Sequence, residues 1–121
     1  MEAILIVDDD LNLCKVLAEE LSEIGYQTTY VTSADAALEH IQREPISLML
    51  LDLKMPEKDG FEVLRELKVR NVTFKVIVLT AYADVVSAME AARMGATDFI
   101  SKPYDFDELL ITIRKVLQKD L

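Results

Sequence analysis

Three carboxylates, a hydroxyl and an amine stand at the ends of short apolar stretches of the chain. They belong to Asp8, Asp9, Asp52, Thr80 and Lys102. Carboxylates held close together repel one another, at on the order of 4 kcal/mol for a pair at ~4 Å and an effective dielectric of about 20, so a divalent cation is expected among them. Oxygen ligands with room for water and a phosphate suit Mg²⁺. With the lysine added, such a group is suited to phosphoryl transfer, which depends on positioning and charge neutralisation.

The chain contains five short stretches with the length and composition of buried β-strands. They are Ala3–Val7, Gln27–Val31, Ile46–Leu51, Lys75–Thr80 and Asp98–Ser101. Apolar residues at helical intervals predict five helices: Leu11 to Ile24, between Ser33 and Pro45, Phe61 to about Val69, a helix capped by Asp84 that reaches Met94, and Phe106 to Leu117 after a cap at Asp105. Apolar strands that alternate with helices predict a doubly wound α/β fold, in which helices cover both faces of a five-stranded parallel sheet through right-handed crossovers.

The order of strands and polar residues predicts one common site. In an open parallel sheet the functional crevice lies beyond the carboxyl ends of the strands, where the winding direction reverses. Each signal alone has a simpler interpretation, because an aspartate after a strand is usually a helix cap, as we expect for Asp10, and Lys-Pro is usually a turn. It is much less probable that chance alone places such residues at the ends of four strands than at the end of one.

Composition and charge restrict the classes of partner. The 121 residues include 22 acidic and 13 basic side chains, for a formal net charge of −9. Nucleic acids and anionic membranes are bound through a surplus of Lys and Arg, so we expect this domain to make no direct nucleic-acid contact and no membrane contact. A partner with a basic surface, or a cation that gathers carboxylates, fits better.

Features that place a protein outside the cytoplasm are missing from the sequence. Cys14 is the only cysteine, so no internal disulfide forms, and we expect it to be a buried thiol in the first helix. The first residues lack the basic segment and long apolar core of a signal peptide. No apolar stretch approaches the ~20 residues of a membrane span. We therefore expect a cytoplasmic protein in which residues 1–121 form one domain.

Several segments are similar to signature segments of response-regulator receiver domains of two-component signal transduction. They are Ile4–Asp10, Leu51–Pro56 with Asp59–Gly60, Leu79–Ala81 and Ser101–Pro103. They occur in the order and at the spacing of that family, and the resemblance covers essentially the whole chain. The stretch Thr80–Pro103 is most similar to receivers of NtrC-like transcriptional activators, which usually precede an ATPase and a DNA-binding domain.

The resemblance implies a phosphoacceptor regulatory domain and not a conventional enzyme. Asp52 would accept a phosphoryl group from the phosphohistidine of a sensor histidine kinase. Asp9, Asp52 and the backbone carbonyl of Lys54 would bind Mg²⁺, and Asp8 would act at the metal mainly through water. Lys102 would pair with a phosphoryl oxygen. The domain would catalyse its own phosphoryl transfer and a slow autodephosphorylation, whose rate the Lys54 side chain leaves open.

The resemblance also implies a route by which the signal leaves the site. Thr80 would donate its hydroxyl to a phosphoryl oxygen, and Phe99 would be the switch aromatic that turns inward when Thr80 moves. Tyrosine is frequent at this position in the family, so here no phenolic hydroxyl takes part in the readout. The peptide bond between Lys102 and Pro103 would be cis, a form that X-Pro bonds adopt at modest cost.

The same resemblance implies the partners. An output domain, a separate protein or a second copy of the chain would bind the face formed by the fourth helix, the fifth strand and the fifth helix, and transcription would be the regulated process. The apolar side chains expected on this face are Val85, Val86, Ala88 and Met94.

Three alternative functions are compatible with parts of the pattern. A stand-alone phosphorelay intermediate would use the same site without an output domain. An aspartyl-phosphate hydrolase of the haloacid-dehalogenase type places a second acid two residues after its nucleophile, where this chain has Lys54. A flavodoxin-like cofactor binder needs a phosphate-cradling loop after the first strand, where Asp8, Asp9 and Asp10 would repel anions.

Overall fold

The computed structural model describes residues 2–81 and 84–118. Within these residues one parallel sheet has the strand order β2-β1-β3-β4-β5. The strands are β1 Ala3–Val7, β2 Gln27–Val31, β3 Leu48–Leu51, β4 Lys75–Thr80 and β5 Asp98–Ser101. The helices are α1 Leu11–Ile24, α2 Ala34–Arg43, α3 Gly60–Val69, α4 Val85–Arg93 and α5 Phe106–Gln118. The predicted doubly wound fold of five strands and five helices is confirmed.

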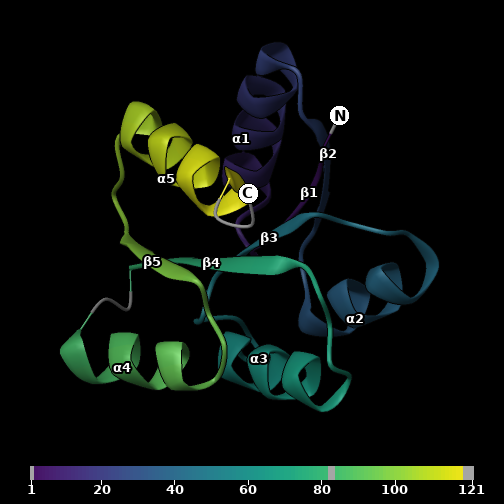
Figure 1. Ribbon diagram of the computed structural model, residues 1–121, viewed down its shortest axis with the longest axis vertical. Coiled ribbons are helices and arrows are strands. Elements are labelled where there is room, and N and C mark those ends of the chain that lie inside the picture. Colours follow the sequence, from purple (N-terminus) through teal and green to yellow (C-terminus); the bar gives the residue numbers. More distant parts are fainter. Residues whose placement is uncertain (1, 82–83, 119–121) are drawn as a thin grey trace.

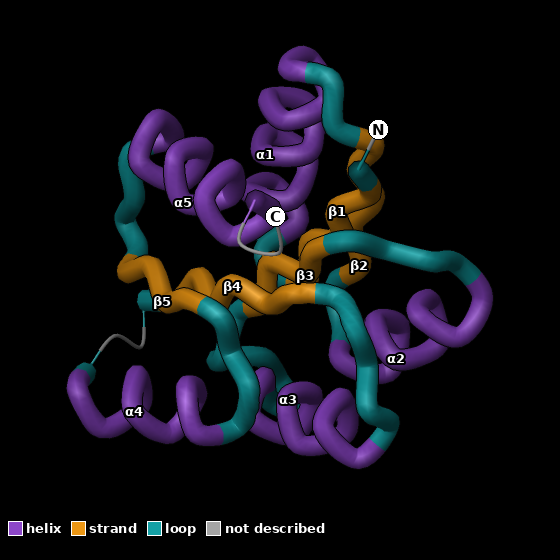
Figure 2. Tube along the Cα trace, viewed as in Figure 1, coloured by secondary structure: helices purple, strands orange, loops and turns teal. Residues whose placement is uncertain are grey.

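The helices lie in two layers, one on each face of the sheet. Figure 1 shows α1 and α5 on one face and α2, α3 and α4 on the other, and Figure 2 shows the strands between these layers. The chain moves from β1 to β2 at one edge, then turns back and adds β3, β4 and β5 in the opposite direction. Because the crossovers are right-handed, this reversal carries the connecting helices to the other face.

Each face of the sheet has its own hydrophobic core. Strand residues buried against α1 and α5 are Ile4, Ile6, Leu48, Leu50, Ile77, Leu79 and Ile100. Strand residues buried against α2, α3 and α4 are Leu5, Val7, Met49, Leu51, Val76 and Val78. Because both faces are covered, the central strands β1, β3 and β4 are nearly continuously apolar and do not alternate, whereas the edge strands β2 and β5 contain polar residues. Each fully buried Leu or Ile contributes about 1.5–3 kcal/mol to the stability of the fold, so the two cores hold the strands in place.

Element boundaries differ from the predicted ones by one or two residues. The strand predicted from Ile46 begins at Leu48, because α2 ends at Arg43 and the chain uses residues 44–47 to return from the helix layer to the sheet. The helix predicted to reach Met94 ends at Arg93. The backbone N–H of Met94 still donates to the carbonyl of Glu90, so Met94 closes the last turn as a cap.

Side chains cap several helices next to the carboxyl ends of the strands. Asp10, predicted to be a cap, accepts a hydrogen bond from the N–H of Leu13 at 3.1 Å and begins α1. Asp59 accepts from the N–H of Glu62 at 3.0 Å and begins α3. Such a cap contributes about 1 kcal/mol. Both caps also fix the lengths of the loops that follow β1 and β3.

Candidate functional site

Strand pairing brings two of the predicted acids side by side. β1 and β3 are neighbours and pair Val7 with Leu51, so Asp8 and Asp52 leave the sheet next to each other. The N–H of Asp52 donates to the Val7 carbonyl at 2.9 Å, which extends the ladder by one residue. The winding reverses between these two strands, so their helices diverge and leave a crevice at this edge of the sheet.

Asp8, Asp9 and Asp52 form an acidic cluster in this crevice. Each offers a carboxylate oxygen, and the three oxygens lie within 4.8 Å of one another. Asp8 and Asp52 are 2% and 7% exposed, whereas Asp9 faces solvent. Two buried oxygen donors and one exposed donor are a ligand set of the kind that Mg²⁺ prefers, with the solvent side available to water and to a phosphate oxygen. The residues present therefore fit this cation.

A lysine lies within the acidic cluster. The Nζ atom of Lys102 lies 2.5 Å from Oδ2 of Asp8 and 3.6 Å from Oδ2 of Asp52. Its backbone N–H donates to the carbonyl of Thr80 at 2.9 Å, which ties the end of β5 to the end of β4. The peptide bond between Lys102 and Pro103 is cis. Three carboxylates and one ammonium leave the group with a surplus of negative charge.

Burial and charge act in opposite directions on the pKa values of this ion pair. Burial raises the pKa of Asp8, and hydrogen bonds from Lys102 and from the N–H of Asp10 offset that rise only in part. Burial lowers the pKa of Lys102, but the hydrogen bond to Asp8 and the charge of Asp52 outweigh it and raise the pKa. Lys102 is therefore a positively charged ammonium at neutral pH, and the acids around it gain from a further cation.

The loop after β3 folds back over Asp52. The N–H of Lys54 donates to Oδ1 of Asp52 at 3.3 Å, and the Lys54 side chain is exposed. Gly60 then approaches the strand end so closely that a Cβ atom there would lie 2.4 Å from the carbonyl oxygen of Asp52 and 2.6 Å from Cα of Leu53. Only glycine fits at position 60. The sequence marked Gly60 as a turn residue, but gave no signal of this contact.

Thr80 and Phe99 lie on the neighbouring strands β4 and β5. Thr80 is fully buried at the carboxyl end of β4 and pairs with Ser101. Phe99 pairs with Val78 and is half-buried against the core under α2, α3 and α4. A buried hydroxyl therefore lies at the same sheet edge as the acids, and a partly exposed aromatic ring lies two residues before that edge on the next strand.

One residue expected on the face formed by α4, β5 and α5 lies elsewhere. Met94 was expected there, but it packs toward α3 and lines a cavity with Leu64 and Leu67. The reason is that α4 ends at Arg93, so Met94 is the C-cap of the helix and belongs to the turn that leads to β5. Met89, which the sequence did not assign to the face, is instead an exposed side chain of α4.

Cys14 contacts the site from the first helix, a contact that sequence reasoning missed. The expected buried thiol is confirmed, because Cys14 is fully buried. Its Sγ donates to the carbonyl of Asp8 at 3.3 Å. Burial, together with the nearby charges of Asp8 and Asp10, raises the thiol pKa to about 11. Cys14 therefore stays protonated at neutral pH, which is the state needed to donate this hydrogen bond.

Comparison with known proteins places this geometry in a family. Residues 4–114 match the family model of the response regulator receiver domain. The transcriptional regulatory protein ZraR of Escherichia coli is 40% identical over 114 residues, which are 94% of this chain and 26% of that protein. Sporulation initiation phosphotransferase F of Bacillus subtilis is 37% identical over 96% of this chain and 94% of its own length. This chain thus spans about a quarter of the transcriptional regulator and nearly all of the phosphotransferase.

A solved structure supports the same assignment. The response regulator protein TrrA of Thermotoga maritima, in complex with Mg²⁺-BeF, is 34% identical and superposes with a TM-score of 0.86 over 96% of this chain and 99% of that chain. This chain belongs to the response-regulator receiver family. The predicted family is therefore confirmed, and a transcriptional regulator among the relatives agrees with the predicted likeness to NtrC-like activators. None of the helices in residues 2–81 and 84–118 has the length and hydrophobicity to cross a membrane.

Proposed function

We propose that residues 1–121 form a single receiver domain that is switched by phosphorylation of Asp52. The observation that carries the proposal is the environment of this carboxylate. Asp52 is buried at the end of a central strand, 3.6 Å from the ammonium of Lys102, and it shares the crevice with Asp8 and Asp9. Asp9 is the exposed member of the cluster, so a phosphodonor approaches Asp52 from the side of Asp9.

The chemistry is a phosphoryl transfer from a histidine of a sensor kinase. A carboxylate oxygen of Asp52 forms a bond to phosphorus while the bond from phosphorus to the imidazole nitrogen breaks, and the electron pair stays on that nitrogen. Lys102 then pairs with a phosphoryl oxygen, for which it must move from Asp8 toward Asp52. Its pKa is raised while it is paired with Asp8, so it enters this movement as an ammonium.

Asp9, Asp52 and the backbone carbonyl of Lys54 would hold Mg²⁺, and Asp8 would act at the metal mainly through water. When bound, the cation neutralises charge on the phosphoryl oxygens. The chain's own contribution is to hold the ligands in place. The hydrogen bond from the Lys54 N–H to Asp52 and the close approach of Gly60 fix the loop that presents the Lys54 carbonyl.

The signal leaves through Thr80 and Phe99. A phosphoryl group on Asp52 adds nearly two negative charges and strong acceptor oxygens, so the Thr80 hydroxyl moves toward it and donates. This movement vacates space beside β4, and Phe99, which is only half-buried, turns into it. The change is a population shift, so its size is limited by how differently the phosphoryl group interacts with the two states.

The responding surface is the face formed by α4, β5 and α5. The exposed large apolar side chains of α4 are Val85, Val86 and Met89, and that of α5 is Ile111. Exposed apolar patches of this kind mark interaction sites. The occupant is an output domain, a separate protein or a second copy of the chain, and the transcriptional regulator among the relatives favours an output in transcription. Similarity to a sporulation phosphotransferase favours onward phosphoryl transfer as the alternative output.

The proposal includes the location of the domain, its phosphodonor and the fate of its phosphoryl group. The domain acts in the cytoplasm with a sensor histidine kinase as phosphodonor. Its net charge of −9 disfavours direct contact with nucleic acid. It is no multiple-turnover hydrolase, because the residue two positions after Asp52 is Lys54 and not a second acid. It catalyses its own phosphorylation and loses the phosphoryl group slowly.

Uptake of a phosphoryl group from a small donor tests the proposal. The protein is incubated with acetyl phosphate in Mg²⁺ or in EDTA, and the intact mass is measured. We expect one added phosphoryl group in Mg²⁺ and none in EDTA. Asp52→Asn should abolish uptake, whereas Glu57→Gln, which neutralises an exposed acid of the same loop, should retain it. Equal uptake by Asp52→Asn and the unchanged protein would contradict the proposal.

A further inference from the structure

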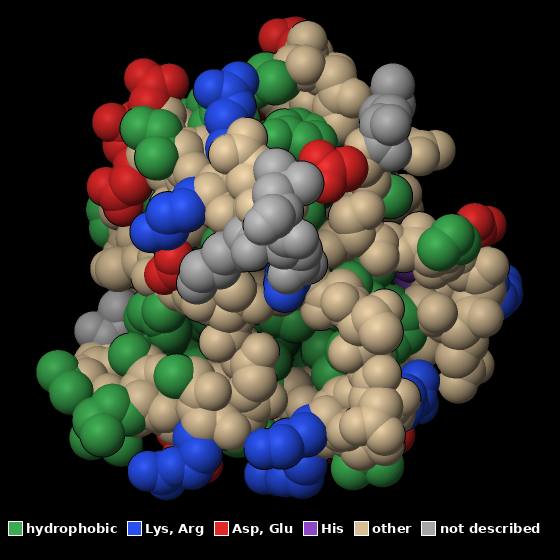
Figure 3. Space-filling model, in the orientation of Figure 1, with side chains coloured by type: hydrophobic (Ala, Val, Ile, Leu, Met, Phe, Trp, Pro, Cys, Tyr) green, Lys and Arg blue, Asp and Glu red, His purple; other side chains and the backbone are tan. Residues whose placement is uncertain are grey.

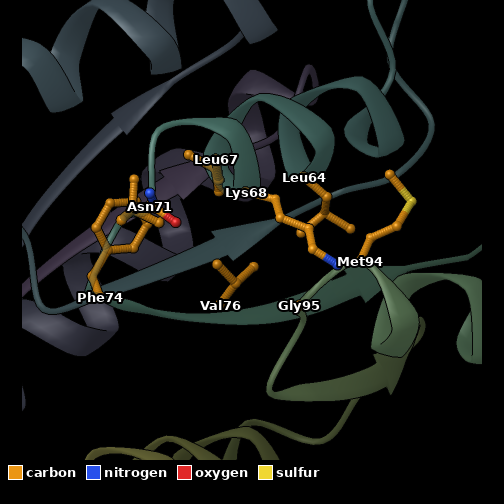
Figure 4. A pocket seen from close by; sticks show the side chains of 9 residues that line it. Leu64, Leu67, Lys68, Asn71, Phe74, Val76, Met94 and Gly95 are labelled. Atoms are coloured by element: carbon orange, nitrogen blue, oxygen red, sulfur yellow. The ribbon is translucent and has the colours of Figure 1, made fainter.

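A cavity of about 210 Å³ lies near the amino end of β4, whereas Asp52 lies at the carboxyl end of the neighbouring strand β3. It is bounded by the end of α3, the turn from α3 to β4, the first residues of β4 and the turn after α4, as Figure 4 shows. Its apolar lining residues are Leu64, Leu67, Val72, Phe74, Val76 and Met94. A cavity of about 150 Å³ with such a lining holds a benzene ring, so this one admits a ring with a small substituent.

The polar groups at the cavity are hydrogen-bond donors more than acceptors. Lys68 extends across the cavity toward Met94 and Gly95 in Figure 4, and its Nζ donates to the carbonyl of Arg93 at 3.3 Å. An ammonium has three N–H donors, so two remain for a ligand. Asn71 lies at the other side of the cavity and carries a side-chain amide.

Several of the neighbouring backbone acceptors are already hydrogen-bonded. At the end of α4, the carbonyls of Glu90, Ala91 and Ala92 accept from the N–H groups of residues 94–96, and the carbonyl of Arg93 accepts from Lys68. At the end of α3, the carbonyls of residues 66–68 accept from the N–H groups of residues 70–72. The side-chain donors of Lys68 and Asn71 therefore favour a ligand that supplies an acceptor.

The local charge favours an anion. Residues 61–76 include four basic and two acidic side chains, a net charge of +2 in a chain whose net charge is −9. In Figure 3 basic side chains lie beside α3 and the end of α4, whereas over α5 basic and acidic side chains lie side by side. These basic side chains attract negative charge, and they offset the partial negative charge that the carboxyl ends of α3 and α4 place at the cavity.

We infer that this cavity is a binding site for a small organic anion with an apolar body, of the size of an arylacetate. The ring occupies the apolar part of the cavity beside Leu64 and Met94, and the carboxylate accepts from the ammonium of Lys68. A ligand of about ten heavy atoms in a half-open cavity binds with a Kd on the order of 1 mM. The site is separate from the acidic cluster, so the inference does not depend on phosphorylation of Asp52.

Amide chemical shifts of the ¹⁵N-labelled protein test the inference, with phenylacetate and its neutral isostere phenylacetamide as probes. We expect saturable shifts in residues 64–76 and 93–96 with phenylacetate, and weaker binding of phenylacetamide. Lys68→Gln should raise the Kd of phenylacetate about fivefold, the size of a partly exposed ion pair, and leave that of phenylacetamide unchanged. Val72→Phe should fill the cavity and abolish binding of both.

Arg65→Gln is the matched control, because it removes one positive charge from the same helix at a residue that does not line the cavity. It should leave the Kd of phenylacetate nearly unchanged. The inference is overturned by an absence of saturable shifts, by shifts centred elsewhere, or by equal affinity for the two probes. Equal effects of Lys68→Gln and Arg65→Gln would also overturn it, since attraction would then be diffuse. A dispersed spectrum of each variant establishes that it is folded.

Discussion

The ammonium of Lys102 lies 2.5 Å from a carboxylate oxygen of Asp8, a residue 94 positions earlier in the chain. The same ammonium is 3.6 Å from Asp52. In the unphosphorylated protein Lys102 is therefore paired mainly with Asp8. Asp52, the proposed phosphoryl acceptor, lies close enough for Lys102 to move to it. In this structure, however, the ammonium is nearer to Asp8 than to Asp52.

Replacement of this lysine should destabilise the protein when no divalent cation is present. Lys102→Gln leaves three neighbouring carboxylates without their compensating charge, so we expect the free energy of unfolding in EDTA to fall by about 2–3 kcal/mol. Urea denaturation measures it. Lys115→Gln is the control, because its ion pair with Asp98 spans 4.0 Å and is largely exposed, so its effect should stay within about 0.5 kcal/mol. Equal stability of Lys102→Gln and the unchanged protein would refute the prediction.

Mg²⁺ should stabilise the native state through the acidic cluster. A ligand that binds only the folded protein adds RT ln(1 + [L]/Kd), about 2.7 kcal/mol at a hundredfold excess over Kd. Asp9→Ala should remove most of this gain, since Asp9 is the exposed member of the cluster. Thermal melting in EDTA and in millimolar Mg²⁺ measures the difference. Melting temperatures that are indifferent to Mg²⁺ would show that the site does not bind it.

A methyl group at position 60 should disrupt the loop that carries Lys54. In Gly60→Ala the new Cβ would lie 2.4 Å from the Asp52 carbonyl oxygen, so the backbone must shift, at a cost of about 3 kcal/mol. Gly95→Ala is the control, because its Cβ meets nothing within 4 Å and only its positive φ of 104° is unfavourable, at about 1–2 kcal/mol. Chemical denaturation ranks the two variants. A smaller loss for Gly60→Ala than for Gly95→Ala would contradict the described contact.

Loss of the Thr80 hydroxyl should separate phosphorylation from its readout. Thr80→Ala retains the acids and Lys102, so it should still take up a phosphoryl group from acetyl phosphate. Amide shifts with and without beryllofluoride, a phosphoryl mimic, should then change less in residues 85–101 than in the unchanged protein. Thr73→Ala, an exposed threonine at the other sheet edge, is the control. An undiminished response of these residues in Thr80→Ala would refute coupling through Thr80 and Phe99.

The fold and the main site residues could be predicted from sequence because they depend on local patterns. Strands buried on both faces, such as Lys75–Thr80, are recognisable from composition, and parallel strands bring their carboxyl ends to one edge. Contacts between distant segments carry no such signal. Three features of the structure depend on how complete helices and strands pack against each other. They are the lack of space for a Cβ atom at Gly60, the hydrogen bond from Cys14 to the Asp8 carbonyl, and the position of Met94 against α3.

The central claim is that Asp52 forms the acyl phosphate, and chemical trapping tests it most directly. Borohydride reduces an acyl phosphate to an alcohol, so a phosphorylated aspartate becomes homoserine, which peptide mass spectrometry can place in the sequence. After incubation with acetyl phosphate and Mg²⁺, we predict homoserine at position 52 and unmodified aspartate at positions 8 and 9. Homoserine at either of those positions, or phosphoryl uptake with an unmodified Asp52, would contradict the proposed mechanism.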